Sequence, residues 1–263
     1  YRFIDTHTHS EYSACGEGVT VAGYADIART TDNIFALTDH SAHLYFPPDS
    51  KWGFWSDEAD EMFEACREDG PRRVREYLDY VRSLQCGGML IGVELDIMPD
   101  GRIVYDEDML GGLDVVLGAV HSMPTIRRKR PVAEVEDEFR FQVRRFGELG
   151  VDALVHPFRQ LLGSGYEVGE ELIRWTVQAA GDAGMALEIN SHKVFPDHDL
   201  AMVHMALEAG VQLSIGTDAH RWAEFGGFSY HRDTLDQAGV DEDAWPEVIW
   251  TPQLPVALAA AGQ

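Results

Sequence analysis

The sequence predicts one α/β barrel domain spanning residues 1–263, and three observations favour this fold class. The length of 263 residues is close to the roughly 250 residues that such barrels use. The chain is 45% hydrophobic and 25% charged, which is typical of globular proteins and excludes disordered, collagen-like and coiled-coil structure. Seven short apolar segments alternate with longer stretches, several of them of helical periodicity, as parallel strands joined by helices do.

Seven segments are predicted to be strands because they are short and apolar on both faces, as expected of parallel strands buried on either side. In chain order they are Arg2–Asp5, Ile34–Thr38, Met89–Glu94, Val115–Val120, Ala153–Val155, Ala186–Ile189 and Leu213–Thr217. The spacing leaves room for a helix between most consecutive strands.

Helical periodicity predicts five helices between these strands, at Glu58–Arg67, Pro71–Ser83, Val135–Leu149, Glu170–Asp182 and Leu200–Ala209. Gly150, Gly184 and Gly210 follow as stop signals. The segment Ser41–Ser56 contains Pro47-Pro48 and several aromatic residues, and we expect a long loop there. Its Tyr45–Trp55 part is a candidate wall for substrate specificity.

Charge and cysteine content narrow the possible partners and the compartment. With 21 basic and 45 acidic residues the net charge is −24, which disfavours long nucleic acids and anionic membranes as partners. A small anionic substrate stays possible, because metal ions can reverse the local field. No apolar segment is long enough to span a membrane, and nothing indicates an oligomeric state. The three cysteines and the absence of a signal-peptide pattern predict a cytoplasmic location.

Side chains able to bind metal or move protons follow nearly every predicted strand. They are Asp5, His7 and His9, then Asp39 and His40, Glu94 and Asp96, His121, His156, Glu188 and Asn190, and finally Asp218 and His220. The carboxyl ends of barrel strands meet at one mouth, so these residues are expected to share one site. Buried imidazoles and carboxylates are costly unless they are paired or bound to metal, and this ligand set suits Zn, Mn or Fe.

These motifs together resemble the PHP (polymerase and histidinol phosphatase) metallohydrolases, in particular the histidinol-phosphatase-like members. The resemblance rests on Asp5-Thr-His7-Thr-His9, Thr38-Asp39-His40, Gly92-Val-Glu94-Leu-Asp96, Val120-His121-Ser122, His156-Pro157, Glu188-Ile-Asn190 and Thr217-Asp218-Ala-His220, in that order. It implies a distorted (β/α)7 barrel that holds two or three divalent ions and hydrolyses phosphate esters.

The resemblance also implies roles for the ligands. His7, His9, Glu94 and Asp218 would hold one ion, and Glu94 would bridge to a second ion completed by His121 and His156. His40 and His220 would hold a third ion, but the position where similar proteins place its remaining ligand is Ala14 or Cys15 here. We expect the Cys15 thiolate to complete that site. The alternatives are Glu17 as the ligand, or a simple two-metal site.

The predicted reaction is hydrolysis of a phosphate ester of a small metabolite. A hydroxide held between two ions about 3.5–4 Å apart would attack phosphorus. Arg159 is a candidate fork for the phosphate, and His43 is a candidate acid for the leaving group. His192 and Lys193 are candidate substrate contacts, and Asp39 is expected to orient a neighbouring group. His198, His204 and His231 lie outside these motifs and are interpreted as structural.

Three other functions stay open. An amidohydrolase-type barrel also begins with His-x-His, but it has eight strands and often a bridging lysine, and no lysine here ends a predicted strand. A nuclease or phosphodiesterase acting on short oligonucleotides would use the same ions. A non-catalytic metal-binding module is disfavoured, because eight of the nine ligand positions expected from the resemblance hold suitable residues.

Overall fold

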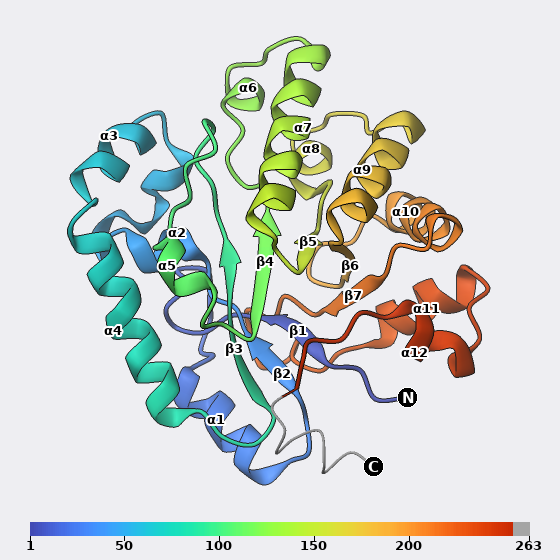
Figure 1. The fold of residues 1–263 in the computed structure, drawn as a ribbon, viewed down its shortest axis with the longest axis horizontal. Coiled ribbons are helices and arrows are strands. Elements are labelled where there is room, and N and C mark those ends of the chain that lie inside the picture. The colour runs from blue at the N-terminus through green and yellow to red at the C-terminus, as the bar shows by residue number, and fades with distance from the viewer. Residues whose placement is uncertain (255–263) are drawn as a thin grey trace.

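The computed structural model describes residues 1–254, and in it seven parallel strands form one sheet in the order β1-β2-β3-β4-β5-β6-β7 (Figure 1). Helices surround the strands, so the predicted fold, a distorted (β/α)7 barrel, is confirmed. The strands are β1 (Asp5–Thr8), β2 (Phe35–Leu37), β3 (Met89–Leu95), β4 (Val115–Ala119), β5 (Ala153–Val155), β6 (Ala186–Asn190) and β7 (Leu213–Gly216).

The barrel is nearly closed, and the contact between its first and last strands is short. Thr8 pairs with Ala219 in an isolated parallel bridge. His9 N donates to Ala219 O at 3.1 Å, and Asp218 N donates to His7 O at 2.8 Å. The buried Asp5 carboxylate reinforces this seam, because it accepts hydrogen bonds from both the backbone N–H and the hydroxyl of Thr217.

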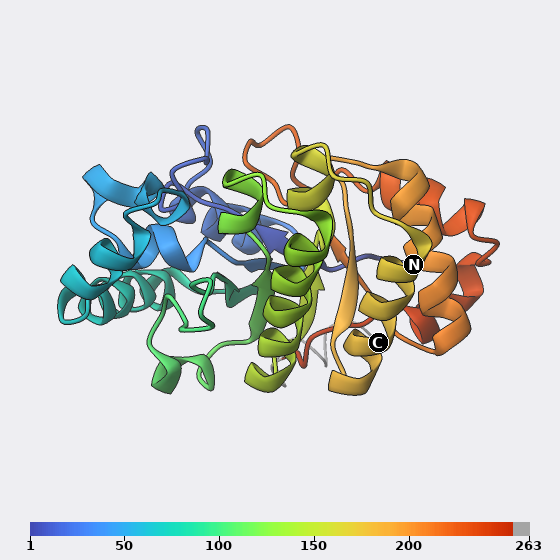
Figure 2. The ribbon, with the colours of Figure 1, turned by 90° about the horizontal axis from the view of Figure 1, so that it is seen from above.

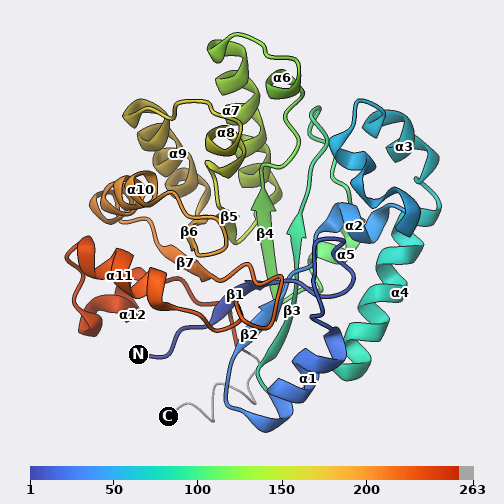
Figure 3. The ribbon, with the colours of Figure 1, turned by 180° about the vertical axis from the view of Figure 1, so that it is seen from behind.

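The helices lie on the outer side of the strands and follow the chain around the barrel, as the views from above and from behind show (Figures 2 and 3). They are α1 (Val21–Thr30), α2 (Ser41–Tyr45), the 3-10 helix η1 (Pro48–Trp55), α3 (Ala59–Ala65), α4 (Asp69–Leu84), α5 (Glu107–Leu110), α6 (Pro124–Arg127), α7 (Val132–Leu149), α8 (Arg159–Gly163), α9 (Glu170–Ala183), α10 (Pro196–Ala209), α11 (Ser229–Gln237), the 3-10 helix η2 (Glu242–Ala244) and α12 (Trp245–Val248). None of the helices within residues 1–254 is long and apolar enough to cross a membrane.

Alternating strand residues face two separate cores. Large side chains such as Phe35, Leu37 and Met89 pack against the helices. A second cluster consists of strand residues alone and is rich in alanine, which suits the narrow barrel interior; its members are Ala36, Leu90, Val115, Leu117, Ala119, Ala153, Val155 and Ala186. The interior is therefore filled with apolar side chains, and the polar residues gather where the strands end.

Two local predictions were wrong. The first strand runs over Asp5–Thr8 rather than Arg2–Asp5, because Thr217 satisfies the Asp5 carboxylate and lets it lie inside the strand. The segment Ser41–Ser56 is not a plain loop, because it folds into α2 and η1. Pro48 lies in the first turn of η1. A backbone N–H has no partner within the helix at this position, so a proline is tolerated there, and its fixed φ angle suits a helix start.

Candidate metal centre

Glu94, near the end of β3, lies at the centre of a ring of imidazoles. One carboxylate oxygen is 2.6 Å from His40 Nδ1, 3.5 Å from His7 Nε2 and 3.6 Å from His9 Nε2. The other oxygen is 2.8 Å from His156 Nε2 and 3.3 Å from His121 Nε2. Glu94 and the five histidines come from five different strand ends, as the convergence at the barrel mouth requires.

Asp218, just past β7, completes this arrangement from the other side of the seam. Its Oδ1 is 2.8 Å from His9 Nε2 and 3.6 Å from His7 Nε2. Asp218 and His156 both adopt positive φ angles, of 52° and 31°. Residues held at such φ angles cost about 1–3 kcal/mol each and are found mostly at functional sites. The rest of the fold therefore stabilises two strained residues whose side chains lie in the centre.

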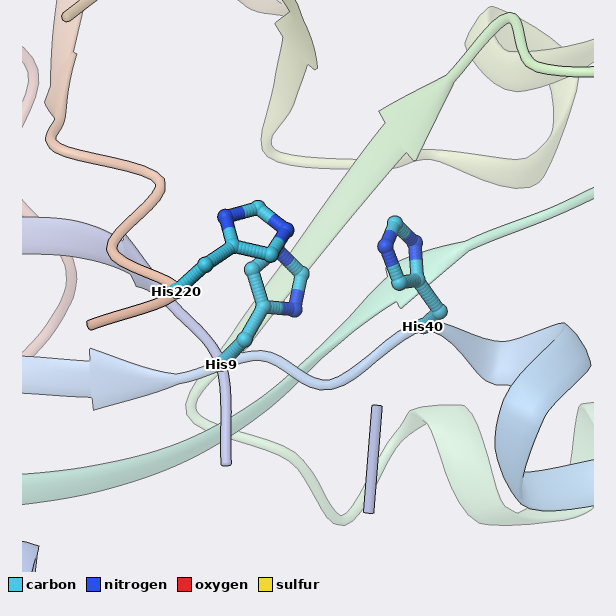
Figure 4. A group of neighbouring side chains, drawn as sticks. All are labelled: His9, His40 and His220. Atoms are coloured by element: carbon cyan, nitrogen blue, oxygen red, sulfur yellow. The ribbon is translucent and has the colours of Figure 1, made fainter. Parts of the chain in front are cut away.

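Several triplets of ligand atoms are close enough to share an ion. Their atoms lie within 4.8 Å of one another in the groups His7–His9–Glu94, His7–His156–Asp218, His40–Glu94–His121, His9–His40–His220 and Cys15–His40–His43. Figure 4 shows His9, His40 and His220, which come from three separate segments of the chain.

Two atoms at the middle of the centre indicate what it is built to hold. His7 Nε2 and Glu94 Oε2 are buried and make no hydrogen bond, although His40 Nδ1 lies 2.6 Å from the carboxylate oxygen. Unpartnered buried polar atoms are costly, and both atoms are ligands for a divalent cation. The residues present therefore fit a metal centre.

A further layer of carboxylates orients the imidazoles. Glu188 Oε1 is 2.8 Å from His7 Nδ1, and Asp96 Oδ1 is 2.7 Å from His121 Nδ1. Carboxylates on the far nitrogen fix the tautomer and direction of a ligating ring. Gly216 leaves the space that Glu188 occupies, because a Cβ on this glycine would lie 1.9 Å from Glu188 Oε1.

Asp39 supports the ligands through hydroxyl groups, in agreement with the orienting role expected for it. Its oxygens accept hydrogen bonds from the backbone N–H and hydroxyl groups of Ser10 and Ser13 and from the Tyr77 hydroxyl. The Ser13 hydroxyl in turn lies 3.1 Å from His9 Nδ1 and accepts from His40 N at 3.1 Å. The Asp39 oxygens are therefore occupied by five hydrogen bonds from Ser10, Ser13 and Tyr77.

The shifted pKa values of Glu94 and His9 favour the protonation states that bind cations. Burial would raise the pKa of Glu94, but the charges of His40, His121 and His7 outweigh it and hold this pKa well below its usual range. Burial, aided by His220 and His40, holds the pKa of His9 well below its usual value. An ionised carboxylate and a neutral imidazole are the forms that bind metal.

Cys15 lies beside His40 and His220, where the sequence placed the last ligand of a third ion. Burial raises the pKa of its thiol, but the charge of His40 and hydrogen bonds with His220 and His40 outweigh burial and lower this pKa to about 7. The alternative ligand, Glu17, lies at the surface and pairs with Arg221 at 3.0 Å. The geometry therefore favours Cys15 over Glu17.

The other candidate residues lie at different distances from the ligands. Arg159 lies in the mouth, with Nη1 donating to Asp218 Oδ2 at 2.6 Å and Nη2 donating to Asn190 Oδ1 at 2.5 Å. The His192 ring packs 4.3 Å from the His220 ring, measured between centroids. Lys193 is exposed.

His43 is 2% exposed, its ring lies 5.1 Å from the rings of Trp52 and Trp55, and its Nδ1 accepts from Ala14 N at 3.1 Å. Burial and the charge of His40 lower its pKa, so the ring stays neutral around pH 7. Its role as an acid for the leaving group stays a prediction.

Two residues of the centre, Asp96 and Trp55, have roles that their sequence context does not specify. Asp96 follows the third strand two residues after Glu94, and this period-2 spacing was a signal for a shared strand face. The Trp55 ring lies 6.2 Å from the His40 ring and 6.0 Å from the His121 ring. The sequence marks the whole Tyr45–Trp55 segment as aromatic and does not indicate which of its rings reaches the centre.

Comparisons with known proteins identify the family of the chain. The family model of the PHP domain matches residues 5–192. A probable phosphatase of Shewanella oneidensis is 30% identical over 248 residues, which are 91% of this chain and 85% of that protein. The DNA polymerase/3′-5′ exonuclease PolX of Bacillus subtilis is 33% identical over 219 residues, 82% of this chain, and the match spans only 34% of that longer protein.

A solved structure shares the fold. Histidinol phosphate phosphatase from Lactococcus lactis, in complex with zinc, L-histidinol and phosphate, superposes with a TM-score of 0.53 at 15% identity. The match covers 91% of this chain and 95% of that one.

Proposed function

The chain belongs to the PHP domain family, and from this premise we propose that it is a metal-dependent phosphatase that hydrolyses phosphate esters of small metabolites. The observation that carries the proposal is the Glu94 carboxylate, which lies within 3.6 Å of five imidazoles and has one oxygen left without a hydrogen bond. A bridging carboxylate amid imidazoles is suited to two cations. The relatives named as probable phosphatases support the same reaction.

We infer which residues hold the ions from the resemblance to the family, and the convergence of these side chains around Glu94 supports the assignment. His7, His9, Glu94 and Asp218 are assigned to one ion, and Glu94 with His121 and His156 to a second ion. A third ion is assigned to Cys15, His40 and His220. Divalent ions supply a nucleophile at neutral pH by lowering the pKa of water, and they neutralise the charge of the phosphate. Zinc, manganese and iron all suit these ligands.

The remaining residues of the mouth position the substrate. Arg159 is 16% exposed at its side chain and faces the centre through its pair with Asp218, so a phosphate bound beside Asp218 would meet the guanidinium. A guanidinium matches two phosphate oxygens at once. Burial would raise the pKa of Asp218, but the charges of His7 and Arg159 outweigh it and hold this pKa well below its usual range, which keeps the carboxylate ionised.

The test compares Glu94→Ala with Glu208→Ala, a matched control that removes an exposed glutamate far along α10. Bound Zn, Mn and Fe are counted per chain, and hydrolysis of a panel of phosphorylated metabolites is measured with each metal separately. We expect wild type and Glu208→Ala to bind at least two ions and to be active, and a chelator to abolish the activity. Glu94→Ala should stay folded by circular dichroism, bind fewer ions and lose at least about a thousandfold in kcat/KM. Substantial activity in a folded, metal-poor Glu94→Ala protein would refute the proposal.

Hydrolysis of a phosphodiester in a short oligonucleotide is a second candidate, because the relative from Bacillus subtilis is named as an exonuclease. The net charge of −24 argues against a long nucleic acid as substrate. A short oligonucleotide assayed beside a monoester separates the two reactions. We also propose a cytosolic location, because Cys15, Cys66 and Cys86 are all unpaired.

A further inference from the structure

Two tryptophans of η1 stand at the edge of the metal centre. The Trp55 ring lies about equally far from the rings of His40 and His121, at 6.2 and 6.0 Å. The Trp52 ring follows 5.5 Å beyond Trp55. Trp52 is 59% exposed, the largest exposure among the large hydrophobic residues of the described chain. Together they form an aromatic wall that runs from the ligands to the solvent.

The wall borders the open side of the centre. Side chains of His121, His40 and His220 are 12%, 10% and 10% exposed, whereas those of His7 and His9 are fully buried. The centre therefore opens past these three rings, and the wall flanks two of them, His121 and His40. The alcohol part of an ester that extends outward on this side would lie along Trp55 and then Trp52.

The wall is held in place, so its rings are preorganised. Phe54, between the two tryptophans, is fully buried, and Arg127 donates to Ser56 O at 3.2 Å and to Asp57 at 3.3 Å. Arg127 also donates to the hydroxyl of Ser122, the residue after His121. These contacts tie the end of η1 to the end of β4. A rigid aromatic surface binds a planar ring at little entropic cost.

The geometry points to a subsite for the leaving alcohol: we propose that Trp52 and Trp55 stack on a planar aromatic or heteroaromatic ring carried by the substrate. This inference rests on the proposed phosphatase function and narrows its substrate class. The Trp52 ring contacts the His43 ring at 5.1 Å and the Trp55 ring at 5.5 Å between centroids, yet 59% of the residue stays exposed. Stacking on a flat ring is the contact that this exposed surface offers.

The test uses two esters, adenosine 5′-monophosphate and ribose 5-phosphate. They share the phosphate and the sugar, and only the first carries the adenine base. Their leaving alcohols are alike, so a difference in kcat/KM reports contacts with the base. Stacking of a base on an aromatic side chain contributes about 1–3 kcal/mol, which is about five- to 150-fold. We expect wild type to prefer the adenosine ester by a factor in that range. Trp52→Ala and Trp55→Ala should each lower this preference about threefold or more, toward equal rates for the two esters, and Trp52→Phe should retain most of it.

Phe141→Ala is the matched control, because Phe141 is an exposed aromatic residue on α7. It should change neither rate. Equal rates for the two esters in wild type, or equal losses for both esters in Trp52→Ala and Trp55→Ala, would overturn the inference while leaving the phosphatase proposal intact. If no ester is hydrolysed with any metal, the proposed function fails. Adenosine binding then decides the inference alone: adenosine should quench the fluorescence of wild type more than that of Trp52→Ala, and identical titration curves would refute it.

Discussion

Replacement of Asp39 tests how the layer behind the ligands supports both the fold and the centre. Asp39 is fully buried and joins the loop after β1 to α4. It does so by accepting from Ser10 and Ser13 in that loop and from Tyr77 of α4. Asp39→Ala removes the acceptor for all these donors, whereas Asp39→Asn keeps one oxygen and presents an amide to hydroxyls that can rotate.

The magnitude follows from the donors left behind. Five hydrogen bonds of 2.6–3.2 Å end on Asp39. Bonds to a charged group contribute about 1.5–3 kcal/mol each, and a buried donor without a partner costs about 1–3 kcal/mol. The three hydroxyls can find other partners, and Ser13 N also donates to Ser10 O at 3.2 Å. We therefore expect Asp39→Ala to lose about 3–5 kcal/mol of unfolding free energy, and Asp39→Asn about 1–2 kcal/mol.

Urea unfolding of the metal-free proteins measures this loss without a contribution from bound ions. A separate zinc titration should show an affinity about 10- to 100-fold weaker in Asp39→Asn, because Ser13 no longer holds His9 and His40 in place. An Asp39→Ala protein within 1 kcal/mol of wild type, with unchanged zinc affinity, would contradict the reasoning.

Three further predictions address single residues. Cys15→Ala should bind one ion fewer per chain, and X-ray absorption of the zinc-loaded wild type should show sulfur at about 2.3 Å that the variant lacks; sulfur scattering that persists in the variant would refute this. Arg159→Ala should raise KM for a phosphate monoester about tenfold or more, because a charged contact with phosphate is lost; unchanged kinetics would assign Arg159 to structural support of Asp218. Burial lowers the pKa of His231 to about 4, whereas the unfolded imidazole binds its proton near pH 6.5. The unfolded state therefore binds more protons between these values, and stability present above pH 6.5 is lost as the pH falls toward 4. The metal-free wild type should lose about 2 kcal/mol more than His231→Gln between pH 7.5 and pH 5, and parallel urea midpoints of the two proteins would contradict this.

The general position of the centre was predictable because parallel strands bring their carboxyl ends together whatever the exact register. His121 and His156 needed only to end a strand to reach Glu94. The contacts between the carboxylates and the histidine rings that they orient could not be predicted in this way. Glu188 meets His7 across 181 positions of sequence, and this contact depends on the small size of Gly216 and on side-chain direction, which strand patterns do not specify.

The missed local elements have separate causes. The helix α1 had a readable signal, because Val21, Tyr24, Ala25 and Ala28 share its buried face and Thr20 accepts from Gly23 N as a cap. The first strand was misplaced because Asp5 is polar, and only the distant Thr217 makes its burial acceptable. The path of the loop that carries Cys15 is fixed by Asp39, a contact that spacing alone could not reveal.

The short seam of the barrel has a consequence for how the chain holds together. His9 and Asp218 are 209 positions apart in the sequence, yet their side chains meet at 2.8 Å across the seam. An ion bound to both would act as a removable cross-link that closes a loop of nearly the whole chain. Cross-links over loops of about 100 residues restrict the unfolded chain by roughly 4–5 kcal/mol in the entropic description. Loss of the metal would then leave this seam more open to proteolysis.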